Sequence, residues 1–343
     1  MISELTIENA TSYLISLGIS DCSNVLAVET LGWGISNTLV KVTTKEGGFV
    51  LKQSLPQLRV DEDWLADRDR IYKEKACIDT LSKVLDNNTI PRVYGCDTDN
   101  FLFVMSCGPD PGINWKEELL AGRVDPNMAY EAGQILYKIH DFSFDNEDVA
   151  SQFIEDKSFQ QLRIDPYYYF TAQQHPDVSN IIIDAASKLL STKSVLVHGD
   201  YSPKNFIVGS EGLFLLDFEV VHYGHPVFDI AFMVNHLFLK AIHNPLAMSS
   251  YIRSIQECVR GYEEPLNIKS DRSSFNSLDS EELLIQLGCL MLARIDGKSP
   301  VEYIINPNTQ EVVRWIAKSI ICGQCSDLSG VIDLINEKAL NNR

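Results

Sequence analysis

The sequence predicts an α+β protein in two parts, a smaller β-rich N-terminal part and a larger, mainly helical C-terminal part. Apolar and polar residues alternate over residues 25–53, which is the period of half-buried strands. From residue 127 onward, apolar residues recur at helical spacing. Between these regions, residues 106–115 (SCGPDPGINW) hold two prolines and two glycines, which interrupt regular structure. We therefore expect one part over residues 1–107 and another over residues 108–343.

The N-terminal part is expected to open with an amphipathic helix over residues 6–17, followed by antiparallel strands over residues 25–53. Residues 61–85 then have the pattern of a long charged helix whose buried side includes Trp64. The apolar run FLFVM, residues 101–105, predicts a further buried strand. Strands, one helix and another strand make a small α+β unit.

The C-terminal part is expected to be mostly helical, with short apolar strands in SVLVHGD (194–200) and GLFLLDFE (212–219). A polar run at residues 266–282 predicts an exposed connection that ends in a helix N-cap at Asp279 or Ser280. Helical periodicity predicts helices at residues 127–141, 178–191, 228–242, 246–263, 280–294 and 308–321.

Composition limits the classes of partner. The chain has 343 residues, 45% of them hydrophobic, which is enough for two coupled cores. Its net charge of −18, without a basic run, argues against nucleic-acid binding. The acidity suits cationic substrates, and it also serves solubility; both interpretations stay open.

Other features indicate a cytoplasmic protein that does not bind membranes. The first 18 residues combine acidic side chains with helical periodicity and lack the basic and apolar regions of a signal peptide. No apolar run approaches the length that spans a bilayer. The eight cysteines are expected to be reduced core residues, because Cys322 and Cys325 lack the two further ligands of a zinc site. Nothing in the sequence indicates the oligomeric state.

Residues 195–219 (VLVHGDYSPKNFIVGSEGLFLLDFE) carry the most chemistry. Three carboxylates and one carboxamide fall on turns beside two short strands: Asp200, Asn205, Asp217 and Glu219. Phosphoryl transfer requires such a set, with one carboxylate to orient and deprotonate the attacking hydroxyl and oxygen ligands to hold Mg²⁺ against the triphosphate. A turn at residues 209–212 is expected to return Asp217 towards the loop that holds Asp200 and Asn205.

These residues resemble the catalytic patterns of the aminoglycoside phosphotransferase and choline kinase superfamily, which is similar to the eukaryotic protein kinases. The sequence His198-Gly199-Asp200, with Asn205 five residues on, matches H-G-D-x-x-x-x-N, and Asp217-Phe218-Glu219 matches D-x-D/E. Other segments, including NWKEELLAG and LLIQLGCLMLARIDGKSPVEYI, are similar to a bacterial subgroup close to methylthioribose kinase. The resemblance implies a protein-kinase-like two-lobed fold with a small antiparallel-sheet N-lobe and a mostly helical C-lobe.

By this resemblance the catalytic group includes Asp200 and His198, and Lys204 joins it by its position between Asp200 and Asn205. Asp200 is the expected base, and His198 is expected to buttress the loop through hydrogen bonds. Lys204 either offsets charge on the transferred phosphoryl group or is a solvated loop lysine. Asp229, in HPVFDIAF, is expected to brace the loop backbone.

The same resemblance implies ATP and Mg²⁺ as cofactors. Asn205 and Asp217 are the expected metal ligands, and Glu219 is a further metal or water ligand. Kinases of this fold also need a strand lysine for the α- and β-phosphates and a helix acid to hold it. Lys52, at the end of the apolar strand in FVLKQ, fits the first role. Glu74 is our choice for the second.

Two other acids, Asp69 and Glu62, compete with Glu74 for the pairing with Lys52. No GxxxxGK[ST] motif follows a predicted strand, which excludes a P-loop nucleotide site. Further nucleotide contacts are expected from the first hairpin, whose exposed N–H groups can cover phosphates, and from the end of the 101–105 strand. These candidates are Gly32, Gly34, Ser36, Asn37, Met105 and Cys107.

The sequence therefore predicts transfer of the ATP γ-phosphoryl group to a hydroxyl of a sugar-like, amino-alcohol or aminoglycoside small molecule. The alternatives are a catalytically silent nucleotide-binding pseudokinase and a protein kinase; Glu219 in place of the DFG glycine disfavours the latter. Four residues are candidates for binding the acceptor, although each also suits a helix terminus or the turn after the break. They are Trp115, Lys116, Arg294 and Asp296.

Overall fold

The computed structural model describes residues 4–20, 22–32, 37–56, 67–268 and 280–341. The chain divides into two compact units, the first made of Met1–Gly112 and Gly209–Val221 and the second of Ile113–Val208 and His222–Arg343. Leu215 ties the segment Gly209–Val221 to the first unit by donating its N–H to the Thr89 carbonyl, 2.7 Å away. Where the chain divides into domains, placed after residue 107 from the sequence, stays a prediction. No described helix is long and apolar enough to span a bilayer.

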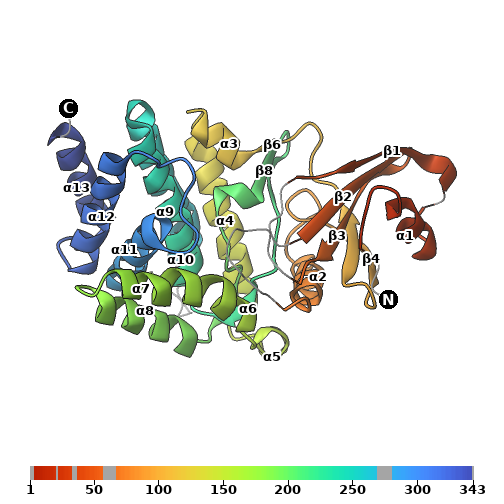
Figure 1. Cartoon of the computed structure of the whole chain (residues 1–343), viewed down its shortest axis with the longest axis horizontal. Helices are drawn as coiled ribbons and strands as arrows, with labels where there is room; N and C mark the ends of the chain where they lie inside the picture. Colours follow the sequence, from red (N-terminus) through yellow and green to blue (C-terminus); the bar gives the residue numbers. More distant parts are fainter. Residues whose placement is uncertain (1–3, 21, 33–36, 57–66, 269–279, 342–343) are drawn as a thin grey trace. The chain divides into compact units, whose positions relative to one another are not determined.

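The first unit is built on one antiparallel sheet with strand order β1-β2-β3-β5-β4 (Figure 1). Its strands are β1 (Val25–Thr30), β2 (Asn37–Thr44), β3 (Gly47–Ser54), β4 (Val93–Asp97) and β5 (Leu102–Ser106). The antiparallel strands predicted over residues 25–53 and 101–105 are confirmed. Lys52 lies on the central strand β3, opposite Leu39 of β2 and Phe103 of β5.

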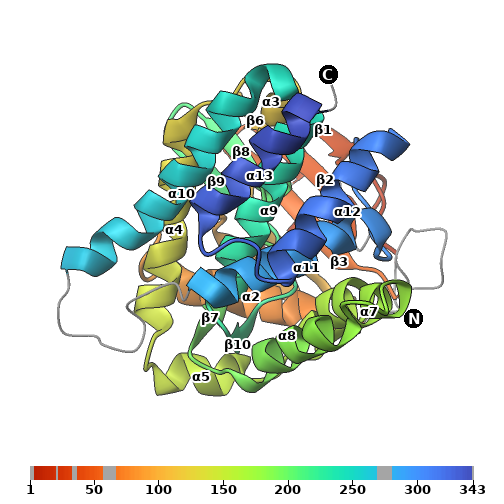
Figure 2. The ribbon, with the colours of Figure 1, turned by 90° about the vertical axis from the view of Figure 1, so that its left-hand side faces the viewer.

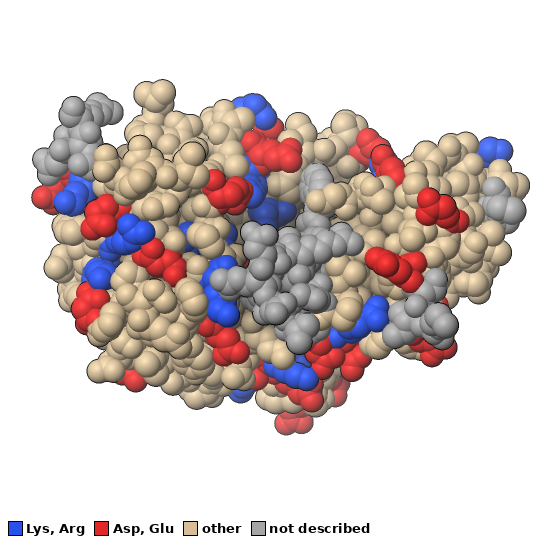
Figure 3. Space-filling model, viewed as in Figure 1, with Lys and Arg blue, Asp and Glu red and all other residues tan. Residues whose placement is uncertain are grey.

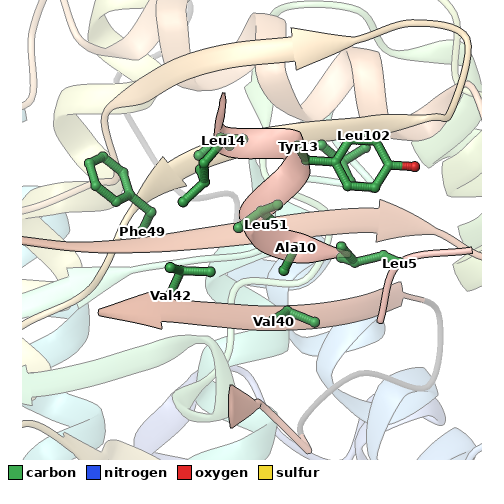
Figure 4. Close-up of a cluster of buried hydrophobic side chains, with 10 residues drawn as sticks. Leu5, Ala10, Tyr13, Leu14, Val40, Val42, Phe49, Leu51 and Leu102 are labelled. Atoms are coloured by element: carbon green, nitrogen blue, oxygen red, sulfur yellow. The ribbon is translucent and has the colours of Figure 1, made fainter. Parts of the chain in front are cut away.

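A helix covers one face of this sheet. The helix α1 (Ala10–Ser16) is shorter than the predicted 6–17, because Asn9 side-chain and backbone bonds form a turn with Glu4 and Thr6 instead of helix. Figure 4 shows the apolar residues of this segment against the sheet. The cluster comprises Leu5, Ala10, Tyr13, Leu14, Val40, Val42, Phe49, Leu51, Leu102 and Val104. A 3₁₀ turn, η1 (Cys22–Asn24), leads into β1.

The long charged helix appears as α2 (Arg70–Leu81), shorter than the predicted 61–85. After Leu81 the backbone forms a turn, with Val84 and Leu85 both donating to the Leu81 carbonyl. Glu62 and Trp64 lie outside the described residues. Ile71, Glu74, Ile78 and Leu81 recur at helical spacing on the buried face of α2, so this face carries one acid among apolar residues.

The second unit is mainly helical (Figures 1 and 2). Each of the six predicted helices is present, and α10 continues to Ile268, into the predicted connection. Residues 269–279 of that connection, with Asp279, are outside the described residues, and residues 280–282 begin α11 instead of extending the connection. The helices are α3 (Trp115–Leu120), α4 (Pro126–Ser143), α5 (Glu147–Phe153), α6 (Lys157–Phe159), the π-helix η2 (Gln160–Tyr169), α7 (Phe170–Gln174), α8 (Ser179–Ser191), α9 (Val227–His243), the 3₁₀ turn η4 (Pro245–Ala247), α10 (Met248–Ile268), α11 (Ser280–Asp296), α12 (Pro307–Ile321) and α13 (Leu328–Asn341).

Helix α9 forms the centre of the second unit, since every residue from Val227 to Ile242 is buried. It packs against α4, α10 and α11. Two glycines allow α4 and α10 to approach closely: a Cβ on Gly133 would lie 2.1 Å from the Cys258 carbonyl oxygen, and one on Gly261 would lie 2.2 Å from that of Tyr130. Figure 2 shows the two helices side by side.

Short strands position the catalytic segment. In the second unit β7 (Val195–Val197) pairs with β10 (His222–Gly224), and β6 (Ile113–Asn114) pairs with β8 (Phe206–Gly209). The loop between β7 and β8 ends in a 3₁₀ turn, η3 (Pro203–Asn205). The strand β9 (Gly212–Leu215) leads to Asp217 in the first unit. The short strands predicted around residues 194–219 are therefore present.

The described cysteine side chains are all free thiols. Cys77, Cys258 and Cys289 are buried, as expected of core residues. Cys322 is exposed, so it is not the core residue that was expected, because it lies at the C-terminal cap of α12. Among the residues that the structure describes, no group of three or more His, Cys, Asp or Glu side chains is placed to hold a metal ion.

Candidate active site

The loop that follows β7 is fixed by a buried carboxylate. Asp229, on the first turn of α9 and 0% exposed, accepts the backbone N–H of His198 (2.7 Å) and of Gly199 (2.9 Å). Gly199 has φ +77°, a left-handed conformation that glycine adopts without strain. Nδ1 of His198 accepts the N–H of Asp200 at 3.2 Å. The bracing predicted for Asp229 is confirmed, and His198 contacts the loop backbone as a buttress would.

Asp200 is 3% exposed and three side chains hold its carboxylate. Oδ1 lies 2.6 Å from Nη2 of Arg163, and Oδ2 lies 2.8 Å from both Nζ of Lys204 and Nδ2 of Asn205. Burial alone would raise the pKa of Asp200, but the charges of Arg163 and Lys204 outweigh burial and hold it well below its usual value. Asp200 is therefore ionised at neutral pH and can accept a hydrogen bond from a hydroxyl.

Arg163 was not found from the sequence. It lies on η2, far from the catalytic segment in the chain, and its Nε also donates to the Gly199 carbonyl at 2.8 Å. One guanidinium thus contacts both the loop backbone and the Asp200 carboxylate. No spacing rule links residue 163 to residue 200. The signal that was available is an arginine among apolar residues in QLRIDPYYYF, which is weak because Pro166 obscures the helical period.

In the first unit Lys52 is buried, 4% exposed, between two carboxylates. Its Nζ lies 2.7 Å from Glu74 Oε2 and 2.6 Å from Asp217 Oδ1. Burial would lower the pKa of Lys52, but Asp217 and Glu74 outweigh burial and raise it, so the ammonium stays charged. Burial raises the pKa of Glu74 to about 7, although the Lys52 charge opposes this shift.

Of the two described acids considered for the pairing with Lys52, Glu74 is the one that contacts it. Asp69 occupies the N-cap position of α2, and Glu62 is outside the described residues. The role of the pair in holding nucleotide phosphates stays a prediction.

The segment after β9 places Asp217 and Glu219 differently. Asp217 has φ +70°, a left-handed conformation that aspartate tolerates better than most residues, and its side chain is partly exposed. Glu219 is buried, and its Oε2 accepts hydrogen bonds from Asn37 Nδ2 (2.9 Å) and Arg70 Nε (3.1 Å). Each of the two carboxylates has a cationic partner, Lys52 for Asp217 and Arg70 for Glu219, but the Asp217 side chain is the more exposed and so the more accessible candidate for a metal.

The donor set suits Mg²⁺. Asn205 uses its Nδ2 on Asp200, which orients the amide so that the carbonyl oxygen Oδ1 points away from that carboxylate. Asp217 offers carboxylate oxygens, one of which contacts Lys52. Carboxylate and amide oxygens are the protein ligands that Mg²⁺ prefers, so the residues present fit this ion. That Asn205, Asp217 and Glu219 bind metal stays a prediction.

Only some of the hairpin residues expected to contact the nucleotide belong to the described part of the chain. Gly32 is exposed and Asn37 is buried, bound to Glu219, whereas Gly34 and Ser36 lie outside the described residues. Met105, on β5, is buried opposite Val50.

Cys107 follows β5 and is partly buried. Its N–H donates to the Gly48 carbonyl at 3.2 Å, and burial raises the pKa of its thiol. The thiol therefore stays protonated at neutral pH and is not a nucleophile. Nucleotide contacts by the hairpin residues, Met105 and Cys107 stay predictions.

Two of the four candidates for acceptor binding, Asp296 and Trp115, have partners that explain their positions structurally. Asp296 is bound by His175 (2.9 Å) and by Arg314 (2.8 Å), and Trp115 is buried against Phe206, so these two side chains have structural partners. Lys116 forms an ion pair with Glu302. Arg294 donates to Tyr167 Oη at 3.0 Å and to Ser299.

Comparisons with known proteins agree with this picture. The family model described as "phosphotransferase enzyme family" matches residues 27–248. A methylthioribose kinase from Pectobacterium atrosepticum is 28% identical over 254 residues, which are 65% of this chain and 62% of that protein. One from Bacillus pumilus is 25% identical over 70% of this chain and 67% of its own length. The chain thus spans less than two thirds of the Pectobacterium protein.

Among solved structures, an ethanolamine kinase from Plasmodium vivax superposes with a TM-score of 0.55 at 15% identity, covering 95% of this chain and 93% of that one. At this identity the match concerns the fold alone. It confirms the predicted kinase-like α+β fold class, with the antiparallel sheet in the N-terminal unit and a mainly helical C-terminal unit.

Proposed function

We propose, because the chain belongs to the phosphotransferase enzyme family, that it is a kinase that transfers the γ-phosphoryl group of ATP to a hydroxyl of a small molecule. The observation that carries this proposal is the state of Asp200, which is kept ionised by Arg163 and Lys204 on a loop braced by Asp229. A carboxylate in this state can accept the hydrogen of an acceptor hydroxyl and aim its oxygen at phosphorus.

In the proposed mechanism Asp200 orients the hydroxyl and receives its proton late, because a carboxylate with a depressed pKa is a weak base. This suits phosphoryl transfer, whose transition state is loose and requires little nucleophilic push. Lys204, 2.8 Å from Asp200, offsets negative charge that develops on the transferred group.

Lys52, held by Glu74, is proposed to bind the α- and β-phosphates of ATP. Since Asp217 contacts the same ammonium, nucleotide phosphates would share Lys52 with that carboxylate. Mg²⁺ would supply positive charge that neutralises the phosphates, and its candidate ligands are Asp217 in the first unit and Asn205 in the second.

The names of the relatives suggest the acceptor class. Methylthioribose kinase and ethanolamine kinase are named for small hydroxylated molecules, one a sugar derivative and the other an amino alcohol. We infer that the acceptor here is likewise a small metabolite with a primary or sugar hydroxyl, and the aminoglycosides remain within the same class.

The test is Mg²⁺-dependent ADP formation from ATP against a panel of methylthioribose, simple sugars, amino alcohols and aminoglycosides. The isosteric change Asp200→Asn should lower kcat by about 10²–10⁴-fold, because the amide cannot accept the proton, while ATP binding changes little. Asp184→Asn, at an exposed position of α8, is the matched control and should keep wild-type turnover. Wild-type turnover by Asp200→Asn contradicts the proposal, and ATP binding without turnover of any acceptor indicates a nucleotide-binding scaffold.

A further inference from the structure

The second unit contains a group of cationic side chains, two of which contact Asp200, in a chain whose net charge is −18. Arg163 and Lys204 are matched by Asp200, and Lys116 is matched by Glu302. The pKa of the buried His236 shows the effect of these cations. Burial lowers this pKa well below its usual value, and the positive charges nearby lower it further; they are Lys240, Arg294, Lys204 and Lys116. Positive charge therefore dominates this region.

Lys240 is the least balanced of these cations. It lies on the buried helix α9, is 1% exposed, and contacts the His236 carbonyl (3.3 Å) and the face of the Tyr303 ring (5.2 Å). No carboxylate among the described residues forms an ion pair with it. Burial, with repulsion from Lys116 and Arg294, lowers the pKa of Lys240 to about 7. A buried ammonium in these surroundings is costly unless an anion joins it.

Two buried donors in the same region have no hydrogen-bond partner among the described residues. They are Nε of Arg294, on α11, and the hydroxyl of Tyr303. The Arg294 guanidinium forms no ion pair with a described carboxylate either. Buried donors are rarely left unsatisfied in proteins, and here two of them accompany the Lys240 ammonium, whose one hydrogen bond within the described residues is to a carbonyl at 3.3 Å. All three groups can bind an anion, and they come from three separate segments.

These donors connect to Asp200 through one aromatic side chain. Arg294 donates to the Tyr167 hydroxyl at 3.0 Å, and the guanidinium of Arg163, which holds Asp200, lies 5.5 Å from the centre of the Tyr167 ring. Burial would raise the pKa of Tyr167, but Arg294 and Arg163 outweigh it and lower the pKa. All of these residues belong to the second unit.

We propose that the phosphate acceptor is an anion, a small hydroxylated molecule whose carboxylate or phosphate group binds Lys240 and Arg294 while its hydroxyl reaches Asp200. This inference rests on the proposed kinase function and specifies its substrate class. It disfavours cationic acceptors such as amino alcohols and aminoglycosides, because Lys240 and Arg294 would repel an ammonium group.

The first experiment compares acceptors that share a six-carbon frame and differ in charge: gluconate, glucose 6-phosphate, glucose and glucosamine. ADP formation by the full chain with ATP and Mg²⁺ should give a kcat/KM at least about 10-fold higher for one of the two acids than for glucose, and lowest for glucosamine. The preferred acid then distinguishes a carboxylate from a phosphate. Equal or better use of glucose or glucosamine overturns the inference while leaving the kinase function intact, provided that Asp200→Asn abolishes the turnover.

The second experiment uses variants. Lys240→Met and Arg294→Gln should each lower kcat/KM for the preferred acid about 10-fold or more, mainly through KM, and leave the KM for ATP unchanged. Lys138→Met, the same change at an exposed position of α4, is the control and should match wild type. Wild-type KM for the acid in Lys240→Met and Arg294→Gln contradicts the inference.

A binding measurement tests whether this region binds an anion and does not require turnover. Inorganic phosphate, gluconate and glucose 6-phosphate, each without nucleotide, are titrated against the full chain while its Tm is recorded. At least one should raise the wild-type Tm by about 2–4 °C and fail to do so in Lys240→Met and in Arg294→Gln. The inference is overturned if no ligand shifts the Tm of the wild type, or if both variants show the same Tm shift as the wild type. Either result counts even if no acceptor is turned over.

Discussion

Two buried lysines in this chain have opposite surroundings. Lys52 has Glu74 and Asp217 within 2.7 Å, and its pKa is raised. Lys240 has a carbonyl and an aromatic face as partners, and its pKa is lowered to about 7. Lys52 thus stabilises its surroundings as a charged group, whereas Lys240 costs folding free energy while it is charged. Sites that sacrifice stability in this way are often functional.

The cost of Lys240 predicts a pH-dependent gain in stability for Lys240→Met. Below about pH 7 both folded and unfolded chains carry the charge, and the folded chain bears the full cost. Between pH 7 and about 10.4 the folded chain loses the proton while the unfolded chain keeps it, so the cost falls. Lys240→Met should therefore raise Tm by roughly 2–6 °C at pH 6, and by progressively less towards pH 9, in thermal unfolding without ligand.

The groups that face Lys240 do not change this sign. Lys116 and Arg294 repel the ammonium of Lys240, Glu302 attracts it and stays ionised because its own pKa is lowered, and His236 stays neutral because its pKa is well below the usual value. Lys138→Met, at an exposed position, should change Tm by less than about 1 °C. A lower Tm for Lys240→Met at pH 6 would show that Lys240 stabilises the fold and would contradict its role in binding an anion.

Individual site residues could be predicted from the sequence where a fixed local spacing identifies them. The five-residue step from Asp200 to Asn205, and the position of Lys52 on a strand, are local patterns. Arg163 and Lys240 have no such pattern, because their partners come from distant segments. Arg294 was a candidate for the acceptor site, yet a helix end explained it equally well, and only its unsatisfied Nε distinguishes the two.

At the level of elements, α9 links the catalytic loop to the proposed anion site. Asp229, on its first turn, holds the loop backbone, and Lys240 lies three turns later on the same buried helix. Periodicity predicted α9 to within one residue at each end, since its apolar pattern is continuous. It missed η2, whose ten residues include Pro166 and do not follow the α-helical period.

The bracing by Asp229 predicts that Asp229→Asn impairs both stability and catalysis. An amide in this position keeps one acceptor oxygen and turns an N–H₂ group towards one of the two backbone donors, which costs about 1–3 kcal/mol. We expect Tm to fall by several degrees and kcat to fall at least 10-fold, because the Asp200 loop is no longer fixed. The KM for ATP should change little, since Lys52 belongs to the other unit.

Asp177→Asn is the control for Asp229→Asn. Asp177 is an exposed carboxylate that pairs with Lys318, and removing such a pair costs at most about 1 kcal/mol. Wild-type kcat in a folded Asp229→Asn variant would mean that the loop keeps its position without the brace.

At the level of the whole molecule, net charge is a poor guide to the substrate. The value of −18 left cationic substrates open, and acidic and basic side chains are interspersed over the face shown in Figure 3. The proposed acceptor region is nevertheless cationic, because Lys116, Lys240 and Arg294 converge from α3, α9 and α11. Convergence of single lysines and arginines from distant helices leaves no trace in composition or in any charge run.

The division of labour between the two units yields a last prediction, on Mg²⁺. Asp217 lies in the first unit with Lys52, and its partly exposed carboxylate is the oxygen donor that we propose for a metal bound to ATP phosphates. If the ion joins Asp217 to the nucleotide, Mg²⁺ should tighten ATP binding to the wild type about 10-fold or more, and Asp217→Asn should lose most of that gain while binding metal-free ATP as well as before. The affinities are compared by calorimetry in Mg²⁺ and in EDTA, with Asp79→Asn, an exposed acid paired with Lys75, as control. A full Mg²⁺ effect in Asp217→Asn would assign the metal to other residues and leave Asp217 as the partner of Lys52 alone.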